Sequence, residues 1–141
     1  MEASVAAGSF LLKFQSDITF VDVAVEMIRA VLDYMKVEDT TNILLVSREL
    51  LKNAVVHGNQ NDGTKEVIFG LHRNSQNRFE LEVEDSGPGV DSRNSENACA
   101  ERDAVPLRNK TGGRGFTIIN RLAEQVILNK PGNKVTVLLE L

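Results

Sequence analysis

The sequence predicts one α/β domain, a two-layer sandwich in which helices cover one face of a mostly antiparallel sheet. Segments with strand and helix patterns mix along the chain, and its 141 residues are the length of a single domain. Hydrophobic residues make up 42% of the sequence, enough for an ordinary core. A chain of this length can bury roughly 68% of the surface that it exposes when unfolded.

The domain is predicted to span residues 9–141, after a flexible leader over residues 1–8. Ser9 to Gln15 has the apolar alternation of a strand, carried by Phe10, Leu12 and Phe14. Thr19 is predicted to begin a helix, with Asp22 in capping-box position. The expected core face of this helix consists of apolar residues at helical spacing: Val23, Met27, Ala30, Val31 and Tyr34.

A second helix is predicted from about Thr40 to His57, where Gly58 is placed to end it. Two strands should follow, over about residues 65–73 and 78–84. The second of these strands alternates apolar residues with glutamates, which predicts one buried and one solvated face.

The last third of the chain has two parts. Residues 90–111 are polar, charged and long for a loop, which indicates a functional lid or a disordered segment. After them, a helix is predicted over residues 115–124. Strands at 125–129 and 134–141 should form a final hairpin around Pro131 to Asn133.

Composition and net charge argue against some classes of function. The net charge of −4 argues against a nucleic-acid partner, and no apolar run approaches the ~20 residues of a membrane span. Cys99 is the single cysteine and cannot pair within the chain, which fits the cytoplasm. The first residues have no basic segment of the kind that begins a signal peptide.

Glu49 and Asn53 form the first candidate site. They are four residues apart, so they share one helix face about 6 Å apart along the axis, and His57 continues the row. An amide oxygen there suits Mg²⁺, and a carboxylate beside it could accept a proton. On spacing alone, the favoured interpretation is the polar stripe of an amphipathic helix, with His57 a structural residue.

Asp85, Gly87 and Gly89 form the second candidate site, at the end of a strand. One interpretation is a tight acidic turn. The other is a buried carboxylate that accepts a hydrogen bond from an exocyclic amine such as that of adenine. Glycines beside it would let a flat base approach the backbone.

Gly112, Gly113 and Gly115 form the third, just before a predicted helix. Free N–H groups and the helix dipole favour anions at such an entry, and Arg114 adds positive charge. A flexible hinge explains the glycines equally well. The segment lacks the Gly-Lys-Ser/Thr of a Walker loop.

Taken in order, the three segments resemble the N box and the two glycine boxes of the GHKL ATPase superfamily. The segments are Glu49 to Asn53 with His57-Gly58, then Asp85 to Gly89, then Gly113 to Phe116. The likeness is closest to the anti-sigma-factor serine/threonine kinases, and it runs from Ser9 to Leu141.

The resemblance implies the Bergerat ATP-binding fold, with ATP and Mg²⁺ as cofactors. Glu49 would be the general base, Asn53 would coordinate Mg²⁺, and Asp85 would hold the adenine amino group. Residues 91–111 would be the ATP lid, and Gly113 to Gly115 would cradle the phosphates. The implied cofactor-binding residues are Asn53, Asp85, Gly87, Gly89, Gly113, Arg114, Gly115 and Phe116.

Kinases of this family phosphorylate an anti-anti-sigma protein and bind a sigma factor, usually as homodimers, so the resemblance implies these partners here. One rival interpretation is an ATP-binding partner-switching module without catalysis. Glu49 favours the enzyme, because binding alone does not require a base. The other rival is the catalytic half of a sensor histidine kinase, but the sequence shows no phosphoacceptor helix pair and no membrane segment.

Overall fold

The computed structural model describes residues 1–87, 114–129 and 132–140. Within these ranges one six-stranded sheet has the order β1-β2-β3-β4-β6-β5, and each neighbouring pair is antiparallel. The strand bounds are Glu2–Ala6 (β1), Ser9–Gln15 (β2), Glu66–Arg73 (β3), Arg78–Asp85 (β4), Gln125–Leu128 (β5) and Lys134–Glu140 (β6).

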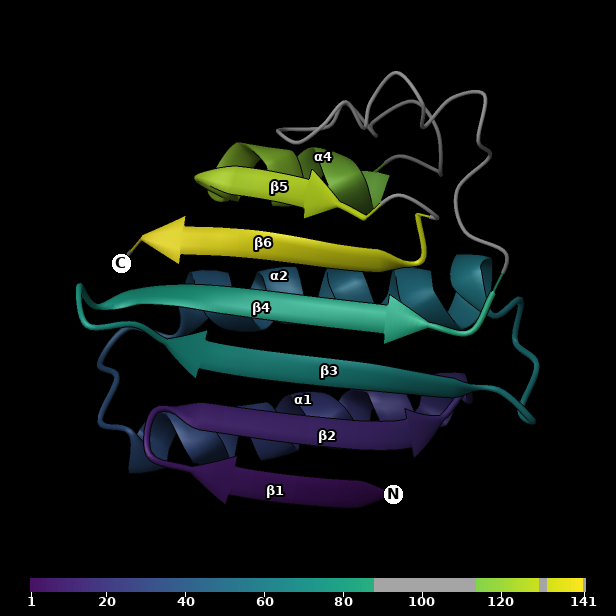
Figure 1. Cartoon of the computed structure of the whole chain (residues 1–141), viewed down its shortest axis with the longest axis horizontal. Coiled ribbons are helices and arrows are strands. Elements are labelled where there is room, and N and C mark those ends of the chain that lie inside the picture. The colour runs from purple at the N-terminus through teal and green to yellow at the C-terminus, as the bar shows by residue number, and fades with distance from the viewer. Residues whose placement is uncertain (88–113, 130–131, 141) are drawn as a thin grey trace.

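In the part of the chain that the structure describes, three α-helices lie on one side of this sheet (Figure 1). They are Ile18–Tyr34 (α1), Thr41–Asn53 (α2) and Arg114–Leu122 (α4), and a π-helical turn, Ala54–Gly58 (η1), continues α2. Helix α2 is the central one and packs against both α1 and α4. This arrangement confirms the predicted two-layer sandwich.

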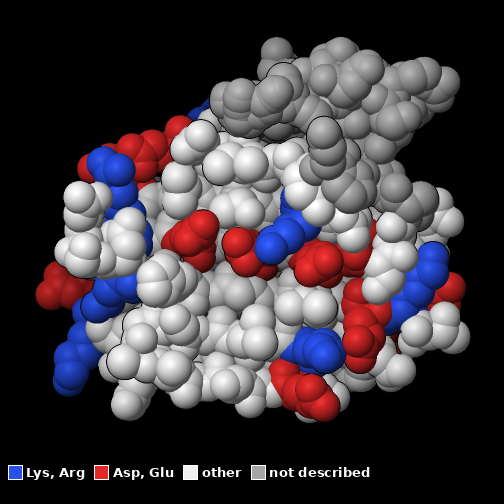
Figure 2. Space-filling model, in the orientation of Figure 1, with Lys and Arg blue, Asp and Glu red and all other residues white. Residues whose placement is uncertain are grey.

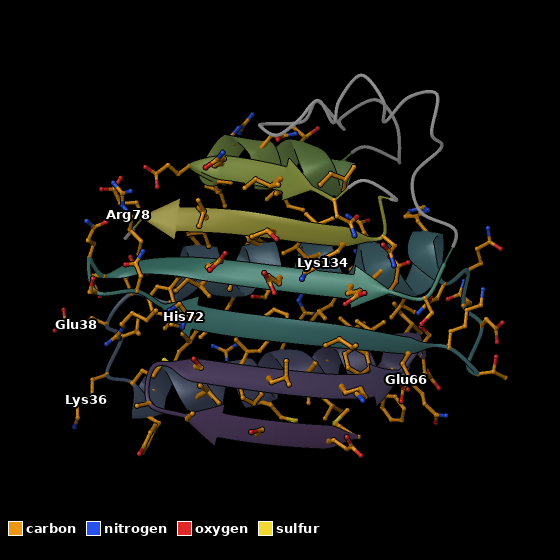
Figure 3. All side chains as sticks on the ribbon, in the orientation of Figure 1. Lys36, Glu38, Glu66, His72, Arg78 and Lys134 are labelled. Carbon is orange, nitrogen blue, oxygen red and sulfur yellow. The ribbon has the colours of Figure 1, made fainter. Side chains whose placement is uncertain are left out.

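The core lies between the sheet and the helices. Alternate side chains of β2, β3 and β4 are buried in it, and Phe14, Phe69 and Phe79 are the largest of those that are fully buried. No helix of the described residues covers the other face of the sheet, the open face, and acidic and basic side chains lie there among uncharged ones (Figure 2). On this face Lys134 Nζ lies 3.6 Å from Glu82 Oε1 (Figure 3).

The first residues are a strand and not a flexible leader. Strand β1 pairs with β2, and Ala6 lies opposite Ser9, so the two strands are joined by a two-residue turn. Gly8 has a φ of 75°, a conformation that tight hairpin turns require and that glycine adopts without strain. The backbone of β1 also satisfies the N–H and C=O groups that β2 would otherwise leave unpaired at the edge of the sheet.

Helix α1 differs from the prediction in its start and in its buried face. Asp17 is the N-cap, and its Oδ1 accepts from the Thr19 backbone N–H at 2.9 Å, so the proposed capping box at Thr19 and Asp22 is wrong. Val23 is 46% exposed and Tyr34 76% exposed. The residues that face the core are Val21, Ala24, Val25, Ile28, Val31 and Leu32. The helix is apolar on more than one side, so periodicity did not single out the buried face.

The other predicted elements agree with the structure to within a few residues at each end. The predicted lid, residues 91–111, lies outside the described residues, as does Pro131 of the last hairpin. Of the helices in the described ranges, none combines the length and apolar character needed to cross a bilayer.

Candidate functional site

Asp85 is the last residue of β4, where the strand leads into a glycine turn. Its side chain is half-buried, and Oδ1 accepts a hydrogen bond from the Gly87 backbone N–H at 2.8 Å. Burial raises the pKa of this carboxyl group above its usual value, because the charged form loses hydration, and the Gly87 bond offsets part of that shift. Among the described residues, Gly87 is the one hydrogen-bond donor to this carboxylate.

Gly58 and Gly87 contact each other beside this carboxylate. A Cβ atom on Gly58 would overlap the carboxyl oxygens of Asp85, and one on Gly87 would overlap the backbone oxygen of Gly58. Position 87 therefore has no room for a Cβ unless backbone moves, whereas a Cβ at position 58 would require the Asp85 carboxyl group to shift. The backbone of η1 thus lies close against the end of β4.

Glu49 and Asn53 lie on α2, which leads directly into this contact. Both side chains are partly exposed, as expected for one face of the helix. Asn53 Nδ2 is buried and has no hydrogen-bond partner among the described residues. An amide in this condition fits a ligand group as its partner, because buried polar atoms without one are rare.

The π turn after Asn53 connects α2 to Gly58, which lies against Asp85. The Asn59 backbone N–H donates to the Ala54 backbone oxygen at 2.8 Å, across five residues. Turns of this kind are rare and occur frequently at functional sites. Gly58 lies within the turn and not after it, and His57 is exposed there.

Asn59 was not singled out by the sequence interpretation. It is fully buried, and its side chain bonds to three segments of the chain. Nδ2 donates to Ser16 Oγ and to the Glu66 backbone oxygen, and Oδ1 accepts from the Ser86 backbone N–H at 2.8 Å. The sequence feature that could have pointed to Asn59 is its position directly after the glycine that ends the helical segment.

The third box is described only in part. Gly89 and Gly113 lie outside the described residues, and Arg114, Gly115 and Phe116 begin α4, with only their backbone described. The elements that carry the three boxes are neighbours, since η1 contacts β4 and α2 contacts α4. The fold therefore brings Glu49, Asn53, Gly58 and Asp85 to one region.

This region is suited to a ligand with an N–H donor. A half-buried acceptor carboxylate lies beside two closely packed glycines, and on the adjoining helix the Asn53 amide nitrogen is buried without a partner among the described residues. These features fit an adenine nucleotide, whose amino group would donate to Asp85.

No curated protein is significantly similar to this chain. The family described as the histidine kinase-like ATPase domain matches residues 14–139, a range that contains all three boxes. Together with the sandwich fold and the geometry around Asp85, this match identifies the family of the chain. The chain belongs to the histidine kinase-like ATPase family.

Proposed function

We propose that the protein is an ATP-dependent serine/threonine kinase that acts as an anti-sigma factor by phosphorylating an anti-anti-sigma protein. Family membership supports the coarser statement that the chain binds ATP. The observation that carries the proposal is the continuity of α2 with the Gly58–Asp85 contact. It connects a helix with a carboxylate and an amide to the half-buried acceptor carboxylate of Asp85.

In this proposal Asp85 binds the adenine amino group. Its carboxylate is half-buried and accepts one bond from Gly87, so a further donor from the base would stabilise the charged form. Gly58 and Gly87 allow the backbone of η1 to lie close against the turn that follows this carboxylate.

Asn53 and Glu49 would act at the phosphate end. The amide of Asn53 would supply an oxygen ligand to Mg²⁺, which takes few protein ligands when phosphates supply the others. Bound ATP would supply the phosphoryl group. Glu49 would take the proton of the attacking serine or threonine hydroxyl of the partner, as a general base.

The partners in this proposal are an anti-anti-sigma protein as substrate and a sigma factor as the regulated protein, with a cytoplasmic homodimer as the acting form. The family match supports the use of ATP in this proposal. The choice of partners rests on the order of the three boxes, which is most similar to that of the anti-sigma kinases.

The test is phosphotransfer with a partner captured from the source cell. Wild-type protein with labelled ATP and Mg²⁺ should label a serine or threonine of that partner. Glu49→Gln should keep ADP affinity within about 2-fold and lose roughly 10²–10⁴-fold in rate, the usual contribution of a general base. Glu80→Gln, the same change on the open face of the sheet, is the matched control and should transfer normally.

Two results would contradict the proposal. Equal losses of binding and rate in Glu49→Gln would make Glu49 a binding residue. Binding of ATP and of the captured partner without any phosphoryl transfer would instead favour the non-catalytic partner-switching module.

A further inference from the structure

One peptide unit at the site is held from both sides by asparagine side chains. It is the unit between Asp85 and Ser86, which links the end of β4 to the glycine turn. Its N–H, from Ser86, donates to Asn59 Oδ1 at 2.8 Å. Its carbonyl, from Asp85, accepts from Asn133 Nδ2 at 2.9 Å.

Asn59 and Asn133 together form a clamp on this peptide unit. The Asn59 side of the clamp is anchored in the core. Asn59 is fully buried, and its Nδ2 donates to Ser16 Oγ and to the Glu66 backbone oxygen. Ser16 is itself buried at the end of β2, and Glu66 begins β3. The side-chain amide is thus oriented by two strands before it bonds to the Ser86 N–H.

The Asn133 side is anchored in the turn between β5 and β6. Its Oδ1 accepts from Asn129 Nδ2 at 3.0 Å, and its backbone oxygen accepts from the Asp85 N–H at 2.9 Å. Asn129 Oδ1 in turn accepts from the backbone N–H groups of Gly132 and Lys134. This side of the clamp is therefore also fixed by several bonds.

We propose that Asn59 and Asn133 are positioning residues that set nucleobase selectivity by fixing the direction of the Asp85 carboxylate. The inference rests on the proposed function, in which that carboxylate binds the adenine amino group. A peptide unit bonded at both its N–H and its carbonyl cannot rotate without breaking two bonds. The glycine at position 87 would otherwise give this turn wide conformational freedom.

Selectivity is a better readout than affinity. Inosine diphosphate has a carbonyl oxygen where ADP has the amino group, so it faces Asp85 with an acceptor. A variant that only reduces the folded fraction weakens both ligands equally, and the ratio of the two Kd values stays unchanged. A variant that misdirects the carboxylate lowers the ratio.

The experiment is calorimetry with ADP and inosine diphosphate, both with Mg²⁺. Wild type should prefer ADP by about 10-fold or more, the equivalent of one hydrogen bond to a charged group. Asn59→Ala and Asn133→Ala should each lower this ratio by about 3-fold or more.

A matched control should keep the wild-type ratio. Asn74→Ala removes comparable side-chain bonds to backbone N–H groups at the β3–β4 hairpin. If Asn59→Ala fails to fold, Asn133→Ala tests the same peptide unit from the other side.

The outcomes distinguish a failure of this inference from a failure of the proposed function. No preference for ADP in wild type, with no effect of Asp85→Asn, would overturn adenine binding by Asp85 and the role of the clamp with it. A clear preference in wild type that both clamp variants retain would overturn the clamp alone.

Discussion

The two ends of strand β4 are held in different ways. At the Arg78 end, Asn74 Oδ1 accepts from the backbone N–H groups of Gln76 and Arg78, which lie two and four residues away. At the Asp85 end, the bonds come from Asn59 and Asn133, over sequence separations of 27 residues to Ser86 and 48 to Asp85. Arg78 and Glu66, which begins β3 beside the Asp85 end, mark these ends in Figure 3.

The hairpin turn at the Arg78 end is stabilised by its own residues, whereas the turn at the Asp85 end is stabilised by residues that are distant in the sequence. The Asn74 turn depends on its own few residues, so a change there should cost stability and nothing else. The Asp85 turn depends on β2, on the π turn and on the β5–β6 connection. A change there should therefore affect both stability and nucleotide binding.

The largest effect on stability is expected from Gly87→Ala. The added Cβ would overlap the backbone oxygen of Gly58, which cannot move aside as a flexible side chain would. Overpacking of this kind typically costs about 1–3 kcal/mol of unfolding free energy. Urea unfolding should show this loss, and calorimetry should show weaker ADP binding.

Gly70→Ala is the matched control for this substitution. A Cβ on Gly70 would meet its nearest atom, Leu11 Cδ1, at 3.9 Å, which is ordinary contact. Because glycine weakens a strand relative to alanine, the change should be neutral or stabilise by up to roughly 1 kcal/mol. The same response in both variants would mean that the Gly58–Gly87 contact does not constrain the site.

A smaller effect is expected from Asn74→Ala. The substitution removes two side-chain hydrogen bonds to the backbone, which should cost about 1 kcal/mol of unfolding free energy. Affinity for ADP should stay at the wild-type value, because the turn lies at the other end of β4. A loss of affinity comparable with that of Asn133→Ala would remove the distinction between the two ends.

The smallest effect is the pH dependence that Asp85 gives to the protein without nucleotide. Its pKa is raised in the folded state, so the folded protein binds this proton more tightly than the unfolded chain does. Stability from this group is therefore greatest below the usual aspartate pKa of about 3.9 and is lost as pH rises through the higher folded value. Asp85→Asn should remove this dependence.

Unfolding curves of wild type and Asp85→Asn across this pH range provide the measurement. At neutral pH the variant should be at least as stable as wild type while its nucleotide binding is weaker. A variant that loses stability as pH rises as steeply as wild type would assign the dependence to another group.

Features with local causes could be predicted from the sequence. The alternation of Phe79, Leu81 and Val83 with glutamates located β4 and its buried face. The candidate residues Glu49 and Asn53 were correctly assigned to a helix and Asp85 to the end of a strand, because each box is a short contiguous pattern.

Features with distant causes could not be predicted. Nothing near Asn59 in the sequence shows that Ser16 and Ser86 are its partners, 43 and 27 residues away. The β1 pairing was missed because a small, exposed strand has no apolar alternation, and its stability comes from β2. The crowding of Gly58 against Asp85 arises only when η1 packs against β4.

Calorimetric titration of wild type and Asp85→Asn with ADP and Mg²⁺ tests the central claim, that Asp85 holds the adenine amino group. Loss of a hydrogen bond to a charged group costs roughly 1.5–3 kcal/mol, so the variant should bind ADP about 10-fold more weakly or worse. Unchanged ADP affinity in a folded Asp85→Asn variant would contradict the claim.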